Sequence, residues 1–315
     1  MRLEQLKALA EIVRQDLSVT RAAEVLGVPQ PAVSRQLRAL ERELGVEIFV
    51  RRQKRLRGLT RPGAAIVEVA RRMLEDADNL AKIGRDFSDE EAGGLTVATT
   101  HTQARYALPA IIERFARRYP KVRLMLRQGN PAEVTQLVAS GEADICIGSE
   151  SAEESAGLAL FACYSMERIV LTPVGHPLLK ARKLTLGTLA RYPVITYDVP
   201  FVGRSKIVKA FAAHGLAPNI VLSAIDTDVI KAYVELGLGI AIVARLAYDP
   251  ARDSKLRAMD ASGLFEPNTI YLGVRRNDYL RGYMYDFIEM FAPRLNRETV
   301  AAGMEPKGRA AREAA

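Results

Sequence analysis

The sequence has 315 residues, 49% of them hydrophobic, and a formal net charge of +8. This length allows two or three domains with cores of their own, and the apolar content excludes a largely disordered chain. The positive charge is concentrated near the N-terminus, because residues 1–72 hold 15 Lys/Arg against 8 Asp/Glu whereas the remaining residues are almost neutral. Such a basic region is typical of proteins that bind nucleic acid.

The chain lacks the features of an exported or membrane-spanning protein. Residues 1–13 contain acidic residues within their apolar pattern, unlike a signal peptide. The longest apolar run, 236–247, is interrupted by glycines and is too short to cross a bilayer. We therefore expect a cytoplasmic protein. Cys146 and Cys163 lie in strand-like apolar runs and are interpreted as reduced packing residues, with a redox pair as the alternative.

A helix is predicted at 3–13, and the stretch 17–44 predicts two further helices joined by a tight turn. Ser18 is a suitable N-cap for a short helix that ends at Gly27, and Pro31 suits the first turn of the next helix. That second helix has apolar residues at intervals of three and four, namely Val33, Leu37, Leu40 and Leu44. Its opposite face would enter the DNA major groove if the pair is a helix-turn-helix; an ordinary helical hairpin is the alternative.

The following residues, 45–61, favour DNA binding over an ordinary hairpin. A β-prone run at 46–50, a basic turn and a return at 59–60 predict a wing. Basic side chains beside a reading helix suit contacts to phosphate. The residues predicted to contact DNA are Ser18, Thr20, Gln30, Pro31, Ser34, Arg35, Arg38, Arg52 and Lys54.

A long helix is predicted at 64–85. Its apolar seam consists of Ile66, Val69, Met73, Leu80 and Ile83. Because the neighbouring sequence offers this seam no surface to pack on, we expect the same helix of a second copy to cover it. The polar segment 87–94 is expected to be a linker.

From residue 95 the pattern changes to strands alternating with helices. Strands are expected at 95–99, 122–126, 144–148, 168–173, 194–197, 220–224, 239–243 and 269–274, and helices at 106–119, 131–140, 206–213, 228–236 and 279–291. Repeated βαβ units imply a parallel sheet with ligand sites at the carboxyl ends of its strands. Two α/β lobes are expected, with the chain crossing between them near 164–167 and 265–269.

This pattern predicts four regions. They are a winged helix-turn-helix at 1–62, a linker helix and hinge at 63–94, an effector-binding α/β domain at 95–295, and a disordered tail at 296–315. Within the α/β domain, lobe I would comprise about 95–164 and 268–295, and lobe II about 165–267. The tail is expected to fray because its Ala/Arg/Glu-rich sequence lacks an apolar face.

The turn after the first α/β strand has the composition of an anion site. Thr100, His101, Thr102 and Gln103 lead into a helix whose first N–H groups point outward. The two hydroxyls and the amide supply neutral donors, which suit sulfate or a carboxylate without a buried countercharge. The alternative is that Thr100 or Thr102 only caps the helix, but capping explains a single hydroxyl.

Nothing in the sequence indicates an enzyme or a metal site. His101 has no nucleophile spaced with it and equally fits a ligand contact or a structural hydrogen bond. Asp226 and Asp228 could form a carboxylate pair, but a helix cap and a favourable first-turn charge are the simpler interpretation. With three histidines and no Cys/His spacing, we predict no metal and no bound cofactor other than a small effector.

The order of helix-turn-helix, wing, long helix and two-lobed α/β domain resembles the LysR-type transcriptional regulators over residues 1 to about 295. Within that family the chain is similar to the CysB/Cbl group, which regulates sulfur assimilation and cysteine biosynthesis. Four segments carry this resemblance: TTHTQARYALP at 99–109, GRS at 203–205, DVIK at 228–231 and YMYDF at 283–287.

The resemblance implies a winged helix joined to a periplasmic-binding-protein-like sensor. It also implies a homotetramer with dimers formed through the long helix, binding to double-stranded promoter DNA, and RNA polymerase as a partner. The implied effector is sulfate, thiosulfate or an O- or N-acetylserine-like molecule. The effector-binding residues that the resemblance implies are Thr100, Thr102, Gln103, Ser149, Val202 and Gly203.

Several positions depart from the group's pattern. Val202 stands where threonine is usual, Ser149 also replaces threonine, Met166 replaces an aromatic residue, and Pro29 stands where serine or threonine is frequent. A LysR-type regulator with a different effector, or with none, is therefore the main alternative. A solute-binding protein would need an export signal and would not use residues 1–60, and an enzyme of the same lobed fold would need a catalytic constellation.

Overall fold

The computed structural model describes residues 1–52, 55–88, 92–149, 157–199 and 201–305, apart from the side chains of 85–88 and 202. The chain forms two compact units, Met1–Ser88 and Asp89–Ala315. Among the described residues, no helix is both long enough and apolar enough to span a membrane.

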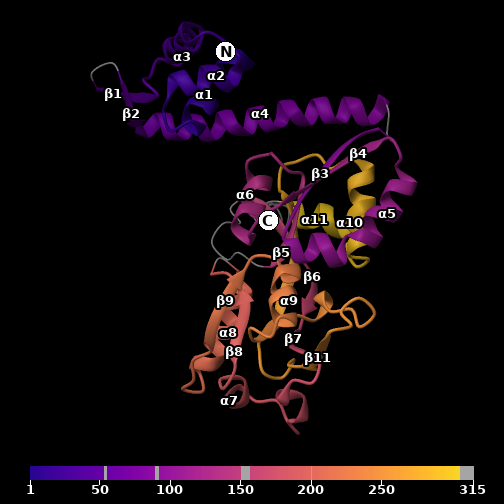
Figure 1. Cartoon of the computed structure of the whole chain (residues 1–315). Coiled ribbons are helices and arrows are strands. Elements are labelled where there is room, and N and C mark those ends of the chain that lie inside the picture. The colour runs from indigo at the N-terminus through magenta and orange to yellow at the C-terminus, as the bar shows by residue number, and fades with distance from the viewer. Residues whose placement is uncertain (53–54, 89–91, 150–156, 200, 306–315) are drawn as a thin grey trace, which may run out of the picture. The chain divides into compact units, whose positions relative to one another are not determined.

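The first unit is built on three helices, α1 (Leu3–Arg14), α2 (Val19–Leu26) and α3 (Gln30–Leu44) (Figure 1). The hydroxyl of Ser18 caps α2 by accepting the N–H of Arg21 at 3.3 Å, and Gly27 ends this helix with φ +65°. Val33, Leu37 and Leu40 of α3 are buried against α1 and α2. Leu44 is 40% exposed, so the predicted apolar face of α3 was too long by this residue.

A short hairpin follows α3, with β1 (Phe49–Arg52) antiparallel to β2 (Arg55–Leu59). The buried carboxylate of Glu41 fastens this wing to α3. Its Oε1 accepts the N–H of Ile48 at 2.9 Å, and its Oε2 pairs with Nη2 of Arg51 at 2.6 Å. A charge-assisted pair of this kind fixes the wing beside the helix more firmly than a neutral hydrogen bond would.

The long helix α4 (Arg61–Ser88) begins directly after the wing. Its first turns pack on their own domain, since Val67 and Ala70 are buried in the core that α1 and α3 form. The expectation that this helix has no surface of its own chain to pack on is therefore wrong for these turns. Other apolar side chains of this helix are exposed, namely Val69, Met73 and Leu80.

The second unit contains two five-stranded sheets. The first sheet has the strand order β4-β3-β5-β12-β6. Its strands are β3 (Gly93–Thr99), β4 (Val122–Gln128), β5 (Ile145–Ser149), β6 (Leu158–Met166) and β12 (Asn268–Arg275). β3 runs parallel to β4 and β5, whereas β12 runs antiparallel to β5 and β6.

The second sheet has the order β11-β7-β10-β8-β9. Its strands are β7 (Arg168–Pro173), β8 (Pro193–Tyr197), β9 (Asn219–Ala224), β10 (Ile240–Ala244) and β11 (Leu256–Asp260). β8 is parallel to β9 and β10, and β7 is antiparallel to β10 and β11. The prediction of parallel sheets thus holds for three neighbouring strands in each sheet and is wrong for the others.

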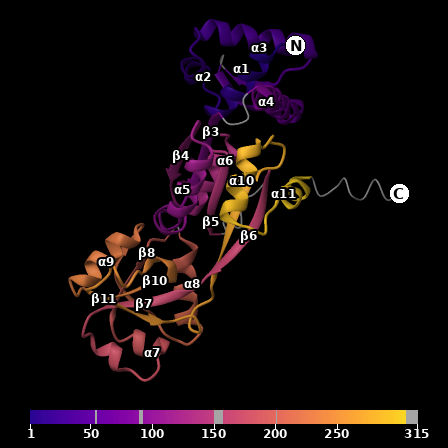
Figure 2. The same ribbon diagram turned by 90° about the vertical axis from the view of Figure 1, so that its right-hand side faces the viewer.

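The antiparallel strands are mostly those that link the two sheets. β6 ends at Met166 and β7 begins at Arg168, so only Glu167 separates a strand of the first sheet from a strand of the second (Figure 2). The chain returns between β11 and β12. A strand that arrives from the other lobe lacks the crossover helix that a parallel neighbour requires, so it pairs antiparallel.

Helices cover both sheets. Those of the first lobe are α5 (Pro109–Arg118), α6 (Pro131–Ala139), α10 (Gly282–Phe291) and α11 (Arg297–Met304), and those of the second lobe are α7 (Leu186–Leu189), α8 (Val202–Ala212) and α9 (Thr227–Glu235). Phe115 of α5 and Phe287 of α10 meet edge-on in the first core, with ring centroids 5.3 Å apart. The strands β6 and β11 and the helix α7 were not predicted.

The helix α11 corrects the prediction of a disordered tail for residues 297–304. Val300 and Met304, four residues apart on one face of this helix, are buried in the core of the first lobe. At Gly303 a side chain would meet the ring of Phe161, so the helix packs closely on β6. Two apolar residues were too short a pattern to predict this contact from sequence. Residues 306–315 lie outside the described part.

Candidate functional site

The exposed face of α3 holds most of the residues predicted to contact DNA. Gln30, Pro31, Arg35 and Arg38 are exposed, and Ser34 is half-buried. Their exposure follows from the helix itself, because the opposite face is buried in the domain core. An exposed polar and basic face near the start of a helix-turn-helix's second helix matches the surface that reads base edges.

The other predicted contacts lie around this helix. Ser18 caps α2, Thr20 is exposed in its first turn, and Arg52 is exposed at the end of β1. Lys54 lies outside the described residues. A concave surface between α3 and the wing is lined by Arg35, Arg38, Glu41, Arg42, Gly45, Val46, Glu47 and Arg51. Four arginines around this hollow make it attractive to phosphate.

In the second unit a pocket lies where the two sheets meet. Its lining residues are Thr100, Thr102, Gln103, Ser149, Met166, Arg168, Tyr197, Phe201, Gly203, Asn268 and Ile270. Both lobes contribute to it, since Thr100 follows β3 whereas Gly203 lies in α8. The predicted effector residues other than Val202 therefore surround one pocket. The backbone of Val202 begins α8, and its side chain is not among those described.

The pocket is small. The space open to the centre of a water-sized sphere is about 30 Å³. One such sphere needs about 10–15 Å³, so this space suits a compact ion or the anionic group of a larger ligand.

The chain passes the pocket in an unusual turn. Residues Gln103–Ala107 form a π-helical turn, in which the N–H of Leu108 reaches the carbonyl oxygen of Gln103. Such wide turns occur frequently at functional sites. The hydroxyl of Thr102 makes no capping hydrogen bond here. Helix capping therefore does not explain Thr102, and its side chain lines the pocket instead.

The amide of Gln103 is completely buried and held on both sides. The hydroxyl of Tyr164 donates to its Oε1, and its Nε2 lies 3.8 Å from the Sδ of Met166. Burial raises the pKa of Tyr164 to about 12, so this phenol stays protonated as a donor. Tyr164 and Met166 both belong to β6. The crossing strand thus orients Gln103 at the pocket.

The two crossing segments each place a pair of side chains on the pocket. Met166 and Arg168 lie on either side of Glu167, and Asn268 and Ile270 begin β12. Residues two apart in an extended chain point to the same side. Arg168 and Asn268 were not predicted as site residues. The one signal in the sequence is an arginine and an asparagine at the predicted crossing points, each followed by an apolar strand.

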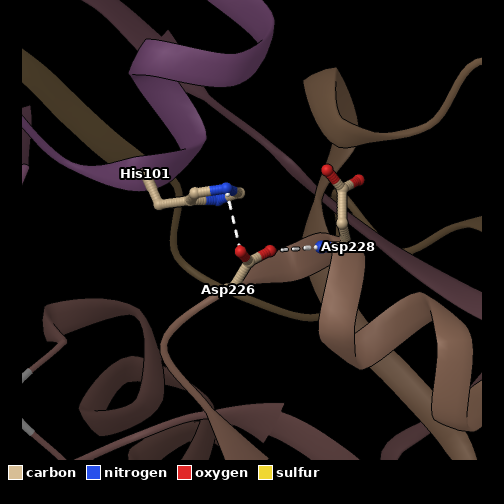
Figure 3. A group of neighbouring side chains, drawn as sticks. All are labelled: His101, Asp226 and Asp228. Atoms are coloured by element: carbon tan, nitrogen blue, oxygen red, sulfur yellow. Dashed lines mark hydrogen bonds and ion pairs between the residues drawn. The ribbon is translucent and has the colours of Figure 1, made fainter.

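A network of polar side chains bridges the lobes beside the pocket (Figure 3). The Nε2 of His101 lies 3.0 Å from Oδ2 of Asp226. The other oxygen of Asp226 accepts the N–H groups of Asp228 and Val229, at 2.7 and 3.4 Å. Asp226 is therefore the predicted cap of α9, and it is also a contact to the opposite lobe.

Asp228 is the second contact across the lobes. The Nε of Arg105 lies 3.0 Å from its Oδ2, and the hydroxyl of Tyr106 donates to its Oδ1. Burial would raise the pKa of Asp228, but the hydrogen bonds from Tyr106 and Arg105 and the charge of Lys231 outweigh it and lower that pKa. Burial raises the pKa of Tyr106, and its hydrogen bond to the Asp228 carboxylate raises it further. The network therefore joins a charged carboxylate to a neutral phenol.

His101, Asp226 and Asp228 could in principle hold a metal ion, because one ligand atom from each lies within 4.8 Å of the others. Asp228, however, already binds Arg105 and Tyr106. A cation would have to displace a positively charged guanidinium from that carboxylate. The cluster is better suited to ion pairing between the lobes, and we refer to it, together with Arg105 and Tyr106, as the interlobe latch.

The cysteines are free thiols and do not line the pocket. Cys146 is on β5 and Cys163 on β6, with β12 between them in the sheet. Burial raises the pKa of Cys146 to about 12 and that of Cys163 to about 11. Thiols so far from ionisation are poor nucleophiles, in agreement with a packing role.

Comparison with protein families and characterised proteins assigns each of the two units to a known family of domains. Residues 3–64 match the family of bacterial regulatory helix-turn-helix proteins of the lysR type, and residues 88–296 match the LysR substrate binding domain. The HTH-type transcriptional regulator SsuR of Burkholderia cenocepacia is 50% identical over 301 residues, which cover 96% of this chain and 98% of that protein. The regulator CysB of the same organism is 44% identical over 305 residues, covering 97% of each chain.

Solved structures agree with this assignment. The cofactor-binding domain of the Cbl transcriptional regulator is 44% identical, with a TM-score of 0.65, and covers 68% of this chain and 95% of that domain. Full-length OxyR from Pseudomonas aeruginosa, at 23% identity and a TM-score of 0.66, shares the fold over 94% of each chain. The chain therefore belongs to the LysR family and is a DNA-binding transcriptional regulator, not an enzyme.

Proposed function

We propose that this regulator controls genes of sulfur assimilation and cysteine biosynthesis in response to a small sulfur oxyanion or an acetylserine-like molecule. The observation that carries the proposal is the pocket itself, where Thr100, Thr102, Gln103, Ser149 and Gly203 meet. Similarity to SsuR, CysB and Cbl over nearly the full chain supports the choice of target genes. The regulator would act in the cytoplasm, where promoter DNA and RNA polymerase are found.

The chemistry of the pocket suits a compact acceptor-rich ligand. Thr100, Thr102 and Ser149 offer hydroxyl donors, and the amide Nε2 of Gln103 is held in place by its neighbours. Several donors that converge on a small space favour sulfate, thiosulfate or the carboxylate of an acetylserine.

A ligand in this pocket would act by stabilising one arrangement of the lobes. The pocket and the interlobe latch are both built from the two lobes, so a ligand that touches both favours their closed arrangement. It can shift the equilibrium only by its difference in affinity for the two arrangements. We therefore expect a graded change in DNA binding.

The same proposal includes a homo-oligomer. Val69, Met73 and Leu80 of α4 are 46%, 37% and 72% exposed, and a second α4 would bury them. Two copies would then present two reading helices to the half-sites of a promoter, as helix-turn-helix dimers do. We propose a dimer through α4 as the unit of a tetramer.

The pocket can be tested with Thr102→Val. In the wild-type protein, millimolar sulfate, thiosulfate or N-acetylserine should raise the melting temperature, because a ligand that binds only the folded state stabilises it. Thr102→Val retains the shape of the side chain but removes one hydroxyl, which should weaken binding about fivefold to tenfold. Differential scanning fluorimetry over a ligand series measures both.

Thr269→Val is the matched control. Thr269 lies on β12 between the pocket residues Asn268 and Ile270 and does not line the pocket. This variant should respond like wild type. Equal responses of wild type and Thr102→Val would place the effector elsewhere. If none of the ligands stabilises the wild-type protein, a regulator with a different effector or none, as Val202 and Met166 allow, becomes the better description.

A further inference from the structure

The pocket contains a charge without a counter-ion. Arg168 is 2% exposed, and its Nε and Nη2 atoms have no hydrogen-bond partner. Among the described residues that line the pocket, none has a carboxylate. Asn268, 4% exposed and also on the pocket, has an Oδ1 atom without a partner.

A buried guanidinium without partners costs folding free energy when no ligand is bound. Buried polar groups are almost always paired, and an exception calls for an explanation such as a missing ion. Burial lowers the pKa of Arg168, but arginine starts so high that the side chain stays charged at neutral pH. An anion in the pocket would satisfy both the charge and the free N–H groups.

The surroundings hold Arg168 in place for this role. A Cβ atom at Gly203 would lie 2.8 Å from its Nη2, so the start of α8 packs directly on the guanidinium. The backbone of Arg168 is fixed by pairing with Ala244 in the sheet. The sheet and α8 thus direct the N–H groups toward the pocket before a ligand binds, which lowers the ordering cost of binding.

We infer that Arg168 is the counter-charge of the effector, and that its free N–H groups donate to the anionic group of the ligand. The inference rests on the proposed effector pocket and names one of its binding residues. A cationic ligand would meet the positive Arg168 and no described carboxylate on the lining.

The test compares wild type with Arg168→Met and Arg168→Gln in the full-length protein. The ligands are sulfate and N-acetylserine. Isothermal titration calorimetry gives affinities, and scanning fluorimetry gives the stability of the ligand-free protein. Arg191→Met, which removes an exposed arginine of the same lobe, is the control.

We expect the substitutions at Arg168 to lower ligand affinity and Arg168→Met not to lower the stability of the ligand-free protein. Both substitutions at Arg168 should weaken binding of sulfate and N-acetylserine by roughly tenfold to hundredfold. Ligand-free Arg168→Met should melt no lower than wild type, because it removes an unpaired buried charge. Arg191→Met should match wild type throughout.

Other outcomes separate this inference from the proposed function. If wild type binds these ligands but Arg168→Met and Arg168→Gln bind them equally well, the effector site is occupied and Arg168 is not the counter-charge of the ligand. A lower melting temperature of ligand-free Arg168→Met would also overturn the inference, since the arginine would then be structural. If wild type binds none of the ligands, the proposed effectors are wrong, and this result is distinct from a failure of the inference on Arg168.

Discussion

At the scale of single residues, Gly203 and Arg168 are packed so closely that one methyl group should alter the pocket. Gly203→Ala would place Cβ 2.8 Å from the Nη2 of Arg168. The guanidinium, being the end of a flexible side chain, should move aside at little cost to folding. We expect sulfate affinity to fall about tenfold, the scale of one charge-assisted hydrogen bond, with a change in melting temperature below about 3 °C.

Gly263→Ala provides the comparison for this variant, because a Cβ at Gly263 meets nothing within 4 Å. Calorimetric titration of both variants with sulfate tests the expectation. If Gly203→Ala binds sulfate as wild type does, the guanidinium is not positioned by this glycine. A large loss of stability would instead mean that Arg168 cannot move, and the pocket would be more rigid than we infer.

The sequence predicted one side of this pocket better than the other. Thr100, Thr102 and Gln103 stand in a row, and their polarity at a strand end is visible without a structure. Arg168 heads an apolar strand, where an arginine is usually a solvated boundary residue. That it is buried depends on how β6 and β7 cross between the lobes, which periodicity cannot show. The expectation of neutral donors that need no buried countercharge did not include the buried Arg168, which lines the pocket.

At the scale of elements, the interlobe latch should depend on the charge of Asp228. Because its pKa is lowered in the folded protein, its contribution to stability is complete above the unfolded carboxyl pKa of about 3.9 and disappears as the pH falls through the lower folded value. Asp228→Asn should melt about 2 °C lower than wild type at pH 7, a small effect because the ion pair is partly exposed, and the difference should shrink below about pH 4.

Glu235→Gln on the same helix is a suitable control, since Glu235 pairs with Lys255 on the surface at 3.6 Å and touches nothing in the opposite lobe that the structure records. Melting curves of the three proteins between pH 3 and 7, at low salt, distinguish the cases. A difference between wild type and Asp228→Asn that stays constant over this range would show that the charge of Asp228 does not hold the latch.

The elements themselves were predicted unevenly. Helices and strands with clear periodicity, such as α3 or β10, appear close to their expected bounds. β6 and α11 were missed for different reasons. β6 has no regular alternation, because buried, half-buried and exposed residues follow one another irregularly along it. α11 has only two buried apolar residues, which is too few for a recognisable helical pattern. The antiparallel strands could not be inferred from local sequence, since pairing direction depends on the path of the whole chain.

At the scale of the whole molecule, the two units divide the work of a regulator. The first unit holds the reading helix α3 and a wing fastened to it by Glu41. The second holds a small pocket with an unpaired arginine and a latch between two lobes. In sequence α4 leads from one to the other, with exposed apolar residues that suit a second copy. In the function that we propose, an anion in the pocket alters how paired reading helices hold promoter DNA.

The most direct test is a DNase footprint of the full-length protein upstream of sulfate-uptake and cysteine-synthesis genes, with and without N-acetylserine. We expect the wild-type protein to protect these sites and the extent of protection to change with the ligand. Arg168→Met should protect the same DNA without that change. Arg35→Ala should lose specific protection in both conditions, because Arg35 lies on the face of α3 that we predict to read bases. A wild-type footprint that is identical with and without N-acetylserine and sulfate would contradict an anion-responsive regulator.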